Sequence, residues 1–264
     1  MANFLEKLDS IAERNKSLLC VGLDPTTAQM PIRDVSTFCT NIIDATKDLV
    51  CAFKPNIAFF EALGLEGLHA LEKILASVPS EIPIILDAKR GDIGSTASAY
   101  AHAAFEVWGA DAVTVSPYLG YDSIEPFLEH EEKCIFLLCR TSNPGGSDFQ
   151  SLSTEISGSS SYLYEHIAMK AKDWNVRKNI GLVVGATVPD ELARIRGICP
   201  DMPLLIPGVG AQGGDIKSSV ENGSNLNGRR AIINSSRQIL YASRKTDYAQ
   251  AARIEAEKLR QHFN

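Results

Sequence analysis

The chain alternates short apolar runs with longer amphipathic segments along most of its length. Most of the apolar runs are nearly continuous, which is typical of strands buried on both faces of a parallel sheet. They predict strands at 17–24, 50–56, 82–89, 111–117, 134–142, 179–187, 202–210 and 229–236. The segments between and after them predict helices at about 35–49, 57–77, 94–107, 123–131, 159–174, 189–197, 214–222 and 246–262.

Eight strands, each followed by a helix, within about 250 residues match the element count of a (β/α)8 barrel. A doubly wound open sheet is the alternative, but no G-x-G-x-x-G follows the first strand. We therefore expect an α/β fold: a (β/α)8 TIM barrel that forms one domain over residues 1–264. An N-terminal helix within 1–16 would cap the bottom of the barrel, 17–240 would form the barrel, and 246–262 would form a C-terminal helix.

Two stretches break the regular alternation. "TSNPGGSDFQSLSTEISGSSS", residues 141–161, is rich in Ser and Gly and stands where a single loop after a strand belongs. We interpret it as a long active-site loop, the alternative being a mobile surface loop. "ENGSNLNG", residues 221–228, precedes the last strand and would lie at the opposite face of the barrel, where we expect a structural turn.

Composition excludes several functional classes. The net charge is −6 and no Lys/Arg-rich run exists, so we expect no nucleic-acid partner. We also expect no membrane association and a cytoplasmic location, because no apolar run is long enough to span a bilayer and the N-terminus does not resemble a signal peptide. The six cysteines form no C-x-x-C, and the five histidines are scattered, which favours reduced buried thiols and no metal site.

Ionisable residues gather where the predicted strands end. The first strand ends in Asp24, the second in Lys54, and the third in "DAKRGD", which supplies Asp87, Lys89 and Asp92. Barrel enzymes keep their sites at the carboxyl ends of their strands. Side chains at i and i+2 of a strand share a face, so Asp87 and Lys89 can point inward together, within reach of Lys54. Asp92 follows Gly91, beyond the strand, and can point away from its own barrel.

A second feature is the glycine-rich run "PGVGAQGGD", residues 207–215, directly before a predicted helix. Exposed backbone N–H groups in such a loop bind phosphate, although a tight turn is the alternative. The position after the seventh strand, together with Arg237 after the eighth, favours phosphate because this is the usual phosphate position in the fold.

Several of these segments together resemble the orotidine 5′-monophosphate decarboxylase family. "DAKRGDIGST" is similar to its D-x-K-x-x-D-I-x-x-T signature, and "GLDP", "KPN", "PGVGAQGGD" and "SSR" match other segments in the expected order. The resemblance covers about residues 17–240 and is similar to the longer bacterial branch. It implies a carboxy-lyase of de novo pyrimidine synthesis that converts orotidine monophosphate to uridine monophosphate and CO2 without metal or organic cofactor.

The resemblance also implies a role for each matched residue. Lys89 would protonate C6, Asp87 and Asp92 would flank the departing carboxylate, and Lys54 would complete the charge network. Asp92 and Thr96 would come from the second subunit of a homodimer whose active sites are shared across the interface. The implied substrate-binding residues are Asp24, Thr96, Ser142, Pro207, Gly208, Gln212, Gly213, Ser236 and Arg237.

Three other interpretations stay open on the residues alone. The charges at 87–92 would be a structural ion-pair cluster in a non-catalytic barrel, or the site of a magnesium-dependent relative such as 3-keto-gulonate-6-phosphate decarboxylase or hexulose-phosphate synthase. A nucleotide-binding regulatory protein would bind uridine monophosphate without turnover. Chelation and a spectrophotometric assay separate these possibilities.

Overall fold

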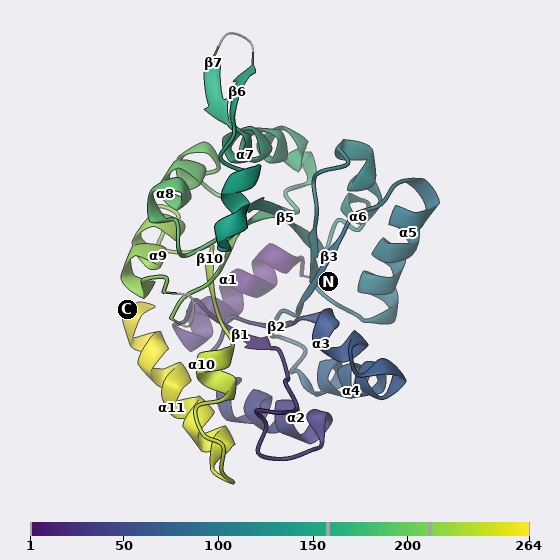
Figure 1. Ribbon diagram of the computed structural model, residues 1–264, viewed down its shortest axis with the longest axis vertical. Coiled ribbons are helices and arrows are strands. Elements are labelled where there is room, and N and C mark those ends of the chain that lie inside the picture. The colour runs from purple at the N-terminus through teal and green to yellow at the C-terminus, as the bar shows by residue number, and fades with distance from the viewer. Residues whose placement is uncertain (1, 157–158, 211–212, 264) are drawn as a thin grey trace.

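Parallel strands form the centre of the molecule in a computed structural model that describes residues 2–156, 159–210 and 213–263. Within these ranges, eight strands form the central sheet and the helices lie outside it (Figure 1). The strands are β1 (Leu19–Leu23), β2 (Ala52–Pro55), β3 (Ile85–Arg90), β4 (Ala112–Val115), β5 (Cys134–Arg140), β8 (Ile180–Val184), β9 (Leu204–Pro207) and β10 (Ala231–Ser235).

The sheet closes on itself. Its hydrogen-bonded order is β2-β1-β10-β9-β8-β5-β4-β3, so each strand lies beside its neighbours in the chain. The two end members, β2 and β3, also meet, because Phe53 pairs with Ile84 and Asn56 pairs with Asp87 in parallel bridges. A doubly wound sheet keeps two open edges. The expected (β/α)8 barrel is therefore confirmed, and the doubly wound alternative is wrong.

The strand residues are buried as their continuous apolar runs predict. Every residue of β1, β2, β4, β8 and β10 is buried. Most of the helices surround the barrel, and the N-terminal helix covers one of its ends (Figure 1). The helices are α1 (Phe4–Asn15), α2 (Val35–Thr46), α3 (Ile57–Glu61), α4 (Gly64–Ser77), α5 (Gly94–His102), α6 (Glu125–Leu128), α7 (Leu163–Trp174), α8 (Pro189–Ile198), α9 (Ile216–Gly223), α10 (Arg237–Leu240) and α11 (Tyr248–Arg260).

Several of the expected helices are shorter or interrupted. The helix expected at 57–77 divides into α3 and α4 beside Gly64, whose φ of +66° lies in the left-handed region. The helix at 94–107 continues beyond α5 only as a π-helical turn, Ala103–Val107. The segment at 123–131 contains only the short α6, which follows a 3-10 turn at Tyr121–Ser123.

The serine-rich stretch 141–161 is not a single loop. It contains a 3-10 turn, Pro144–Asp148, and the strand β6 (Ser153–Ile156), which pairs antiparallel with β7 (Ser159–Tyr162). This hairpin projects beyond α7, away from the barrel (Figure 1). The helix expected from 159 therefore begins only at Leu163, because residues 159–162 satisfy their backbone groups by pairing with β6.

The N-terminal helix α1 covers the end of the barrel where the strands begin. The Phe4 ring packs edge-on against Phe136 of β5, with 5.7 Å between the ring centroids. Lys7 Nζ lies 2.7 Å from Asp111 Oδ2, just before β4, and Arg230, just before β10, pairs with Asp9 at 2.6 Å. These contacts seal the face opposite the strands' carboxyl ends.

The cysteines and the apolar segments also have their expected surroundings. All six cysteines are free and buried. Burial raises the pKa of the Cys20 thiol to about 12 and that of Cys199 to about 11, which keeps both protonated at neutral pH. Among the described residues, no helix is both long and apolar enough to cross a membrane. The cytoplasmic location stays a prediction.

Candidate active site

A cavity of about 290 Å³ opens at the carboxyl ends of the barrel strands. Nine of the residues proposed from the sequence line it, and they come from six of the strand ends. These residues are Asp24, Lys54, Asp87, Lys89, Ser142, Pro207, Gly208, Ser236 and Arg237. The residues expected at these strand ends therefore line one continuous pocket.

A row of alternating charges forms one wall of this pocket. Lys54 Nζ lies 2.9 Å from Asp87 Oδ2, and Lys89 Nζ lies 2.6 Å from Asp87 Oδ1. The side chain of Lys54 is only 4% exposed, whereas that of Lys89 is 49% exposed. One ammonium is thus buried behind the carboxylate, and the other reaches the open part of the cavity.

The charges in this row reinforce one another. Burial alone would raise the pKa of Asp87, but the ammonium groups of Lys54 and Lys89 outweigh it and hold the pKa well below its usual range. Burial would lower the pKa of Lys54, but the carboxylates of Asp87 and Asp24 outweigh it and raise that pKa above its usual value. Both members of the buried pair are therefore charged at neutral pH.

The backbone at Lys89 departs from regular strand geometry. Its φ is +46°, in the left-handed region that residues other than glycine seldom adopt. The β3–β4 pairing also shifts register between Leu86 and Arg90. Asp87 and Lys89 do meet, as the i, i+2 argument predicts, but they meet on a bulged strand end rather than on a regular one.

The glycine-rich segment and the end of β10 form the opposite side of the pocket. Gly208 has a φ of +101°, and its carbonyl accepts the N–H of Gly214 at 3.0 Å. Gly22 allows β1 to approach this region, because a Cβ there would lie 1.8 Å from Ser236 Oγ. Arg237 begins α10 and is exposed at the pocket rim. Gln212 lies outside the described residues.

The chain after β1 is held by hydrogen bonds to Tyr241, which follows α10. Tyr241 donates its hydroxyl proton to the Asp24 carbonyl at 2.9 Å and accepts the Thr26 N–H at 2.6 Å. Asp24 Oδ1 is buried and has no hydrogen-bond partner among the described residues. A buried carboxylate oxygen at a pocket wall is suited to accept a hydrogen bond from a ligand hydroxyl.

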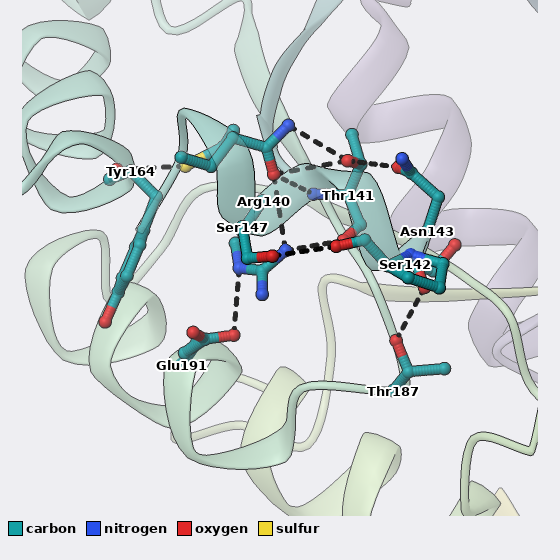
Figure 2. Close-up of polar contacts among 11 residues, drawn as sticks. Arg140, Thr141, Ser142, Asn143, Ser147, Tyr164, Thr187 and Glu191 are labelled. Atoms are coloured by element: carbon teal, nitrogen blue, oxygen red, sulfur yellow. Dashed lines mark hydrogen bonds and ion pairs between the residues drawn. The ribbon is translucent and has the colours of Figure 1, made fainter. Parts of the chain in front are cut away.

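The end of β5 is anchored by a separate polar cluster (Figure 2). The buried Arg140 places Nε 3.0 Å from Glu191 Oε2, so Arg140 supports the strand end and does not line the pocket. Gln150 accepts the Thr141 N–H at 2.8 Å, which turns the chain after the strand. The Ser142 carbonyl accepts the Thr187 hydroxyl at 3.1 Å. This network places Ser142 at the pocket.

Three of the expected site residues do not line the pocket. Asp92 accepts the N–H of Ile93 at 2.8 Å, and Thr96 is exposed on the first turns of α5. Gly213 closes the glycine-rich turn by donating its N–H to the Gly210 carbonyl at 2.8 Å. The Asp92 carboxylate therefore does not line the pocket built by one chain, and its contribution to a neighbouring pocket stays a prediction.

Five polar residues that the sequence argument did not select also line the pocket. Each lies within two residues of a selected residue or interrupts an apolar run, and this position in the sequence was the signal that could have identified it. They are Asn56, Thr114, Thr141, Asn143 and Asn234. Among the described residues, no group of three His, Cys, Asp or Glu side chains is arranged to hold a metal ion.

Comparison with known proteins gives a consistent result over nearly the whole chain. A family model described as "Orotidine 5'-phosphate decarboxylase / HUMPS family" matches residues 17–252. The orotidine 5′-phosphate decarboxylase of Dehalococcoides mccartyi is 53% identical over 262 residues, which cover 99% of this chain and 97% of the relative. That of Roseiflexus castenholzii is 53% identical over 269 residues, with 99% and 97% covered.

Solved structures extend the comparison to the fold. The Leishmania donovani OMP decarboxylase superposes with a TM-score of 0.87 at 42% identity, and 99% of each chain is covered. The Leishmania donovani UMP synthase superposes with a TM-score of 0.89 at 44% identity and covers 100% of this chain. The chain spans 57% of the length of that synthase.

Proposed function

The chain belongs to the orotidine 5′-phosphate decarboxylase / HUMPS family, and we propose that it converts orotidine 5′-monophosphate to uridine 5′-monophosphate and CO2. The observation that carries the proposal is the Lys54–Asp87–Lys89 row at the pocket wall. The half-exposed ammonium of Lys89 faces the cavity, and the Asp87 carboxylate, itself paired with Lys54, holds it in place. The product is a pyrimidine nucleotide, so the enzyme would act in pyrimidine synthesis.

Lys89 is the proton donor in this mechanism. When the bond between C6 and the carboxylate breaks, the electron pair stays on C6, where no conjugated group accepts it. A fixed ammonium beside C6 stabilises this developing negative charge and then transfers a proton to it, so the products are CO2 and the C6-protonated pyrimidine. Asp87 holds the Lys89 ammonium in place, and no metal or organic cofactor takes part in the step.

The other side of the pocket would bind the ribose phosphate. Arg237 and the backbone of Gly208 and Ser236 suit a phosphate, because a guanidinium and backbone N–H groups are strong donors to its oxygens. Asp24 would accept a ribose hydroxyl, and Ser142 would contact the pyrimidine edge. Binding energy from the phosphate helps the remote reaction by orienting C6 against Lys89.

We further propose that the working enzyme is a homodimer with shared active sites. Asp92 and Thr96 do not line the pocket of their own chain, and large apolar side chains are exposed on the same and the adjacent loop. Ile93 is 58% exposed, Tyr118 is 90% exposed and Leu119 is 46% exposed. A second copy that covered these side chains would place its Asp92 and Thr96 at the neighbouring pocket.

A spectrophotometric assay with orotidine 5′-monophosphate tests the function directly. We expect loss of the orotate absorbance and formation of uridine 5′-monophosphate and CO2, both unchanged after dialysis against EDTA. Binding of uridine 5′-monophosphate without turnover would instead identify a regulatory nucleotide-binding protein. Activity that chelation removes and Mg²⁺ restores would identify a metal-dependent relative, assayed with its own sugar phosphate.

A further inference from the structure

We propose that Thr114 of β4 is a positioning residue for Lys89. Its hydroxyl group binds the Lys89 backbone and the Asp87 carboxylate at the same time, and so directs the Lys89 ammonium toward the reacting carbon. The inference rests on the proposed decarboxylation and deepens it. Thr114 acts through these two neighbours and needs no contact of its own with the substrate.

The first observation is the interruption of the β3–β4 ladder beside Thr114. Leu86 pairs with Val113, and the next pair is Arg90 with Val115. The chain thus advances from 86 to 90 on β3 but only from 113 to 115 on β4. A regular ladder would give the N–H groups in this bulge carbonyl partners, and the shift removes them.

The second observation is that the Thr114 hydroxyl takes the place of those carbonyls. Thr114 Oγ1 accepts the Ala88 N–H at 3.0 Å and the Lys89 N–H at 2.9 Å. Thr114 is 1% exposed, so water does not compete for these donors. The side chain therefore supports the left-handed backbone of Lys89, whose φ is +46°.

The third observation concerns the hydroxyl proton. A hydroxyl group has one proton to donate and two lone pairs to accept hydrogen bonds. Both lone pairs of Thr114 Oγ1 are used by the two backbone N–H groups, and Asp87 Oδ1 lies 3.0 Å away. The proton is thereby directed at Asp87, and the hydrogen-bonding capacity of the hydroxyl is complete.

These bonds connect the backbone N–H of Lys89 to its own side-chain ammonium through Thr114 Oγ1 and Asp87 Oδ1. Asp87 Oδ1 accepts the Lys89 ammonium at 2.6 Å and the Thr114 hydroxyl at 3.0 Å, while Thr114 also holds the Lys89 N–H. Without the hydroxyl, the bulge would lose two backbone hydrogen bonds and the carboxylate would lose one donor. A displaced ammonium would still bind Asp87 but would be misaligned with the substrate.

The test uses Thr114→Val, which keeps the shape of the side chain and removes its hydroxyl. We expect kcat to fall by about 10- to 100-fold, the effect of misplacing a reacting group, while KM changes less than about threefold. Binding of uridine 5′-monophosphate should be unchanged, because the phosphate and ribose contacts remain. Thr114→Ser restores the hydroxyl and should retain activity within about twofold of the wild type.

Thr46→Val is the matched control. Thr46 is fully buried in α2 and donates its hydroxyl to the Ile42 carbonyl at 2.7 Å, away from the pocket. Thr114→Val should lose more thermal stability than Thr46→Val, because it leaves two buried backbone N–H groups without an acceptor, and only Thr114→Val should lose kcat. If Thr46→Val lowers kcat as much as Thr114→Val does, or if Thr114→Val keeps kcat within about twofold of the wild type, the positioning role is wrong.

A second variant covers the case in which Thr114→Val does not fold. Thr114→Cys places a thiol, a weak donor and weak acceptor, at nearly the same position as the hydroxyl. We expect kcat of this variant to be lower by about fivefold or more. Wild-type kcat in this variant would overturn the inference. A wild-type protein that does not decarboxylate orotidine 5′-monophosphate would overturn the proposed function and the positioning role together.

Discussion

Lys54 and Asp87, 33 residues apart in the chain, bring Nζ and Oδ2 to 2.9 Å at the mouth of the barrel. Their side chains are 4% and 11% exposed, so neither charge has much access to water. Removing one partner of such a buried pair leaves an uncompensated charge, which is more costly than losing the attraction alone. The stability of the barrel mouth is therefore linked to the ionisation of this pair.

The first prediction concerns pH and the variant Asp87→Asn. The pKa of Asp87 is lower in the folded than in the unfolded protein, so its contribution to stability is complete above the unfolded value of about 3.9 and decreases as pH falls below it. The pKa of Lys54 is raised, so its contribution is lost only as pH rises beyond its usual range. At neutral pH, the free energy of unfolding of the wild type should exceed that of Asp87→Asn by about 3–5 kcal/mol.

Urea unfolding at a series of pH values measures this difference. It should be fully present near neutral pH and become smaller as pH falls below about 4. Asp44→Asn is the control, because Asp44 of α2 forms an exposed pair with Lys47, the residue that follows this helix. A difference between wild type and Asp87→Asn that stays constant down to pH 3 contradicts the assignment of the pair.

The second prediction is that Lys89→Ala abolishes turnover and leaves binding of uridine 5′-monophosphate largely intact. Lys89 is the ammonium that reaches the open cavity from the charge row, whereas the phosphate contacts lie at the other side. Steady-state assays and titration calorimetry give the two quantities. Lys170→Ala, at an exposed position of α7, serves as control. Retention of more than about a tenth of kcat, a loss of only about 1.4 kcal/mol, excludes Lys89 as the essential acid.

The third prediction is that Arg237→Ala mainly raises KM for orotidine 5′-monophosphate. A residue that contacts only phosphate cannot affect a substrate without one, so kcat/KM for orotidine should change little. Kinetics with both substrates, and with Arg244→Ala as an exposed control in the next segment, separate the effects. Equal losses on orotidine and its phosphate are incompatible with a phosphate-binding role.

The fourth prediction concerns the shared site. Lys89→Ala and Asp92→Ala homodimers should each be nearly inactive, because each damages both sites. The two variants are dissociated, mixed in equal amounts and allowed to reassociate at random. Half of the resulting dimers then contain one chain of each variant, and each of these dimers has one doubly damaged and one intact site. Roughly a quarter of all sites should therefore recover.

Subunit exchange is verified in the same experiment with two differently tagged chains. If exchange occurs and no activity returns, Asp92 acts within its own barrel and the shared-site proposal is wrong. The decarboxylase assignment would remain, since both single variants would still be inactive.

The position of the candidate site could be predicted from the sequence because of a topological rule. The carboxyl ends of parallel barrel strands meet at one mouth, so polar residues that follow successive apolar runs must come together there. This rule alone predicts that Asp24, Lys54 and Asp87 come together, although they are far apart in the chain. The eight apolar runs likewise predicted the barrel, because strands buried on both faces need near-continuous apolar residues.

The stretch 141–161 shows where local pattern is insufficient. Its serine and glycine content is compatible with a loop, but residues 153–156 and 159–162 pair as a hairpin. Such pairing depends on which backbone groups meet across the turn, and polar residues do not specify this by alternation. The sequence pattern therefore predicts a helix from residue 159, whereas the helix begins four residues later, at Leu163.

At the end of β3, the residue types alone specify which charged groups are present, whereas contacts between distant segments specify how these groups are held. "DAKRGD" after an apolar run predicts an inward carboxylate and ammonium. The register shift against β4, the left-handed backbone of Lys89 and the three bonds of the Thr114 hydroxyl come from contacts between segments about 25 residues apart. Periodicity records which face a residue occupies, whereas register is set only when two strands and their side chains pack together.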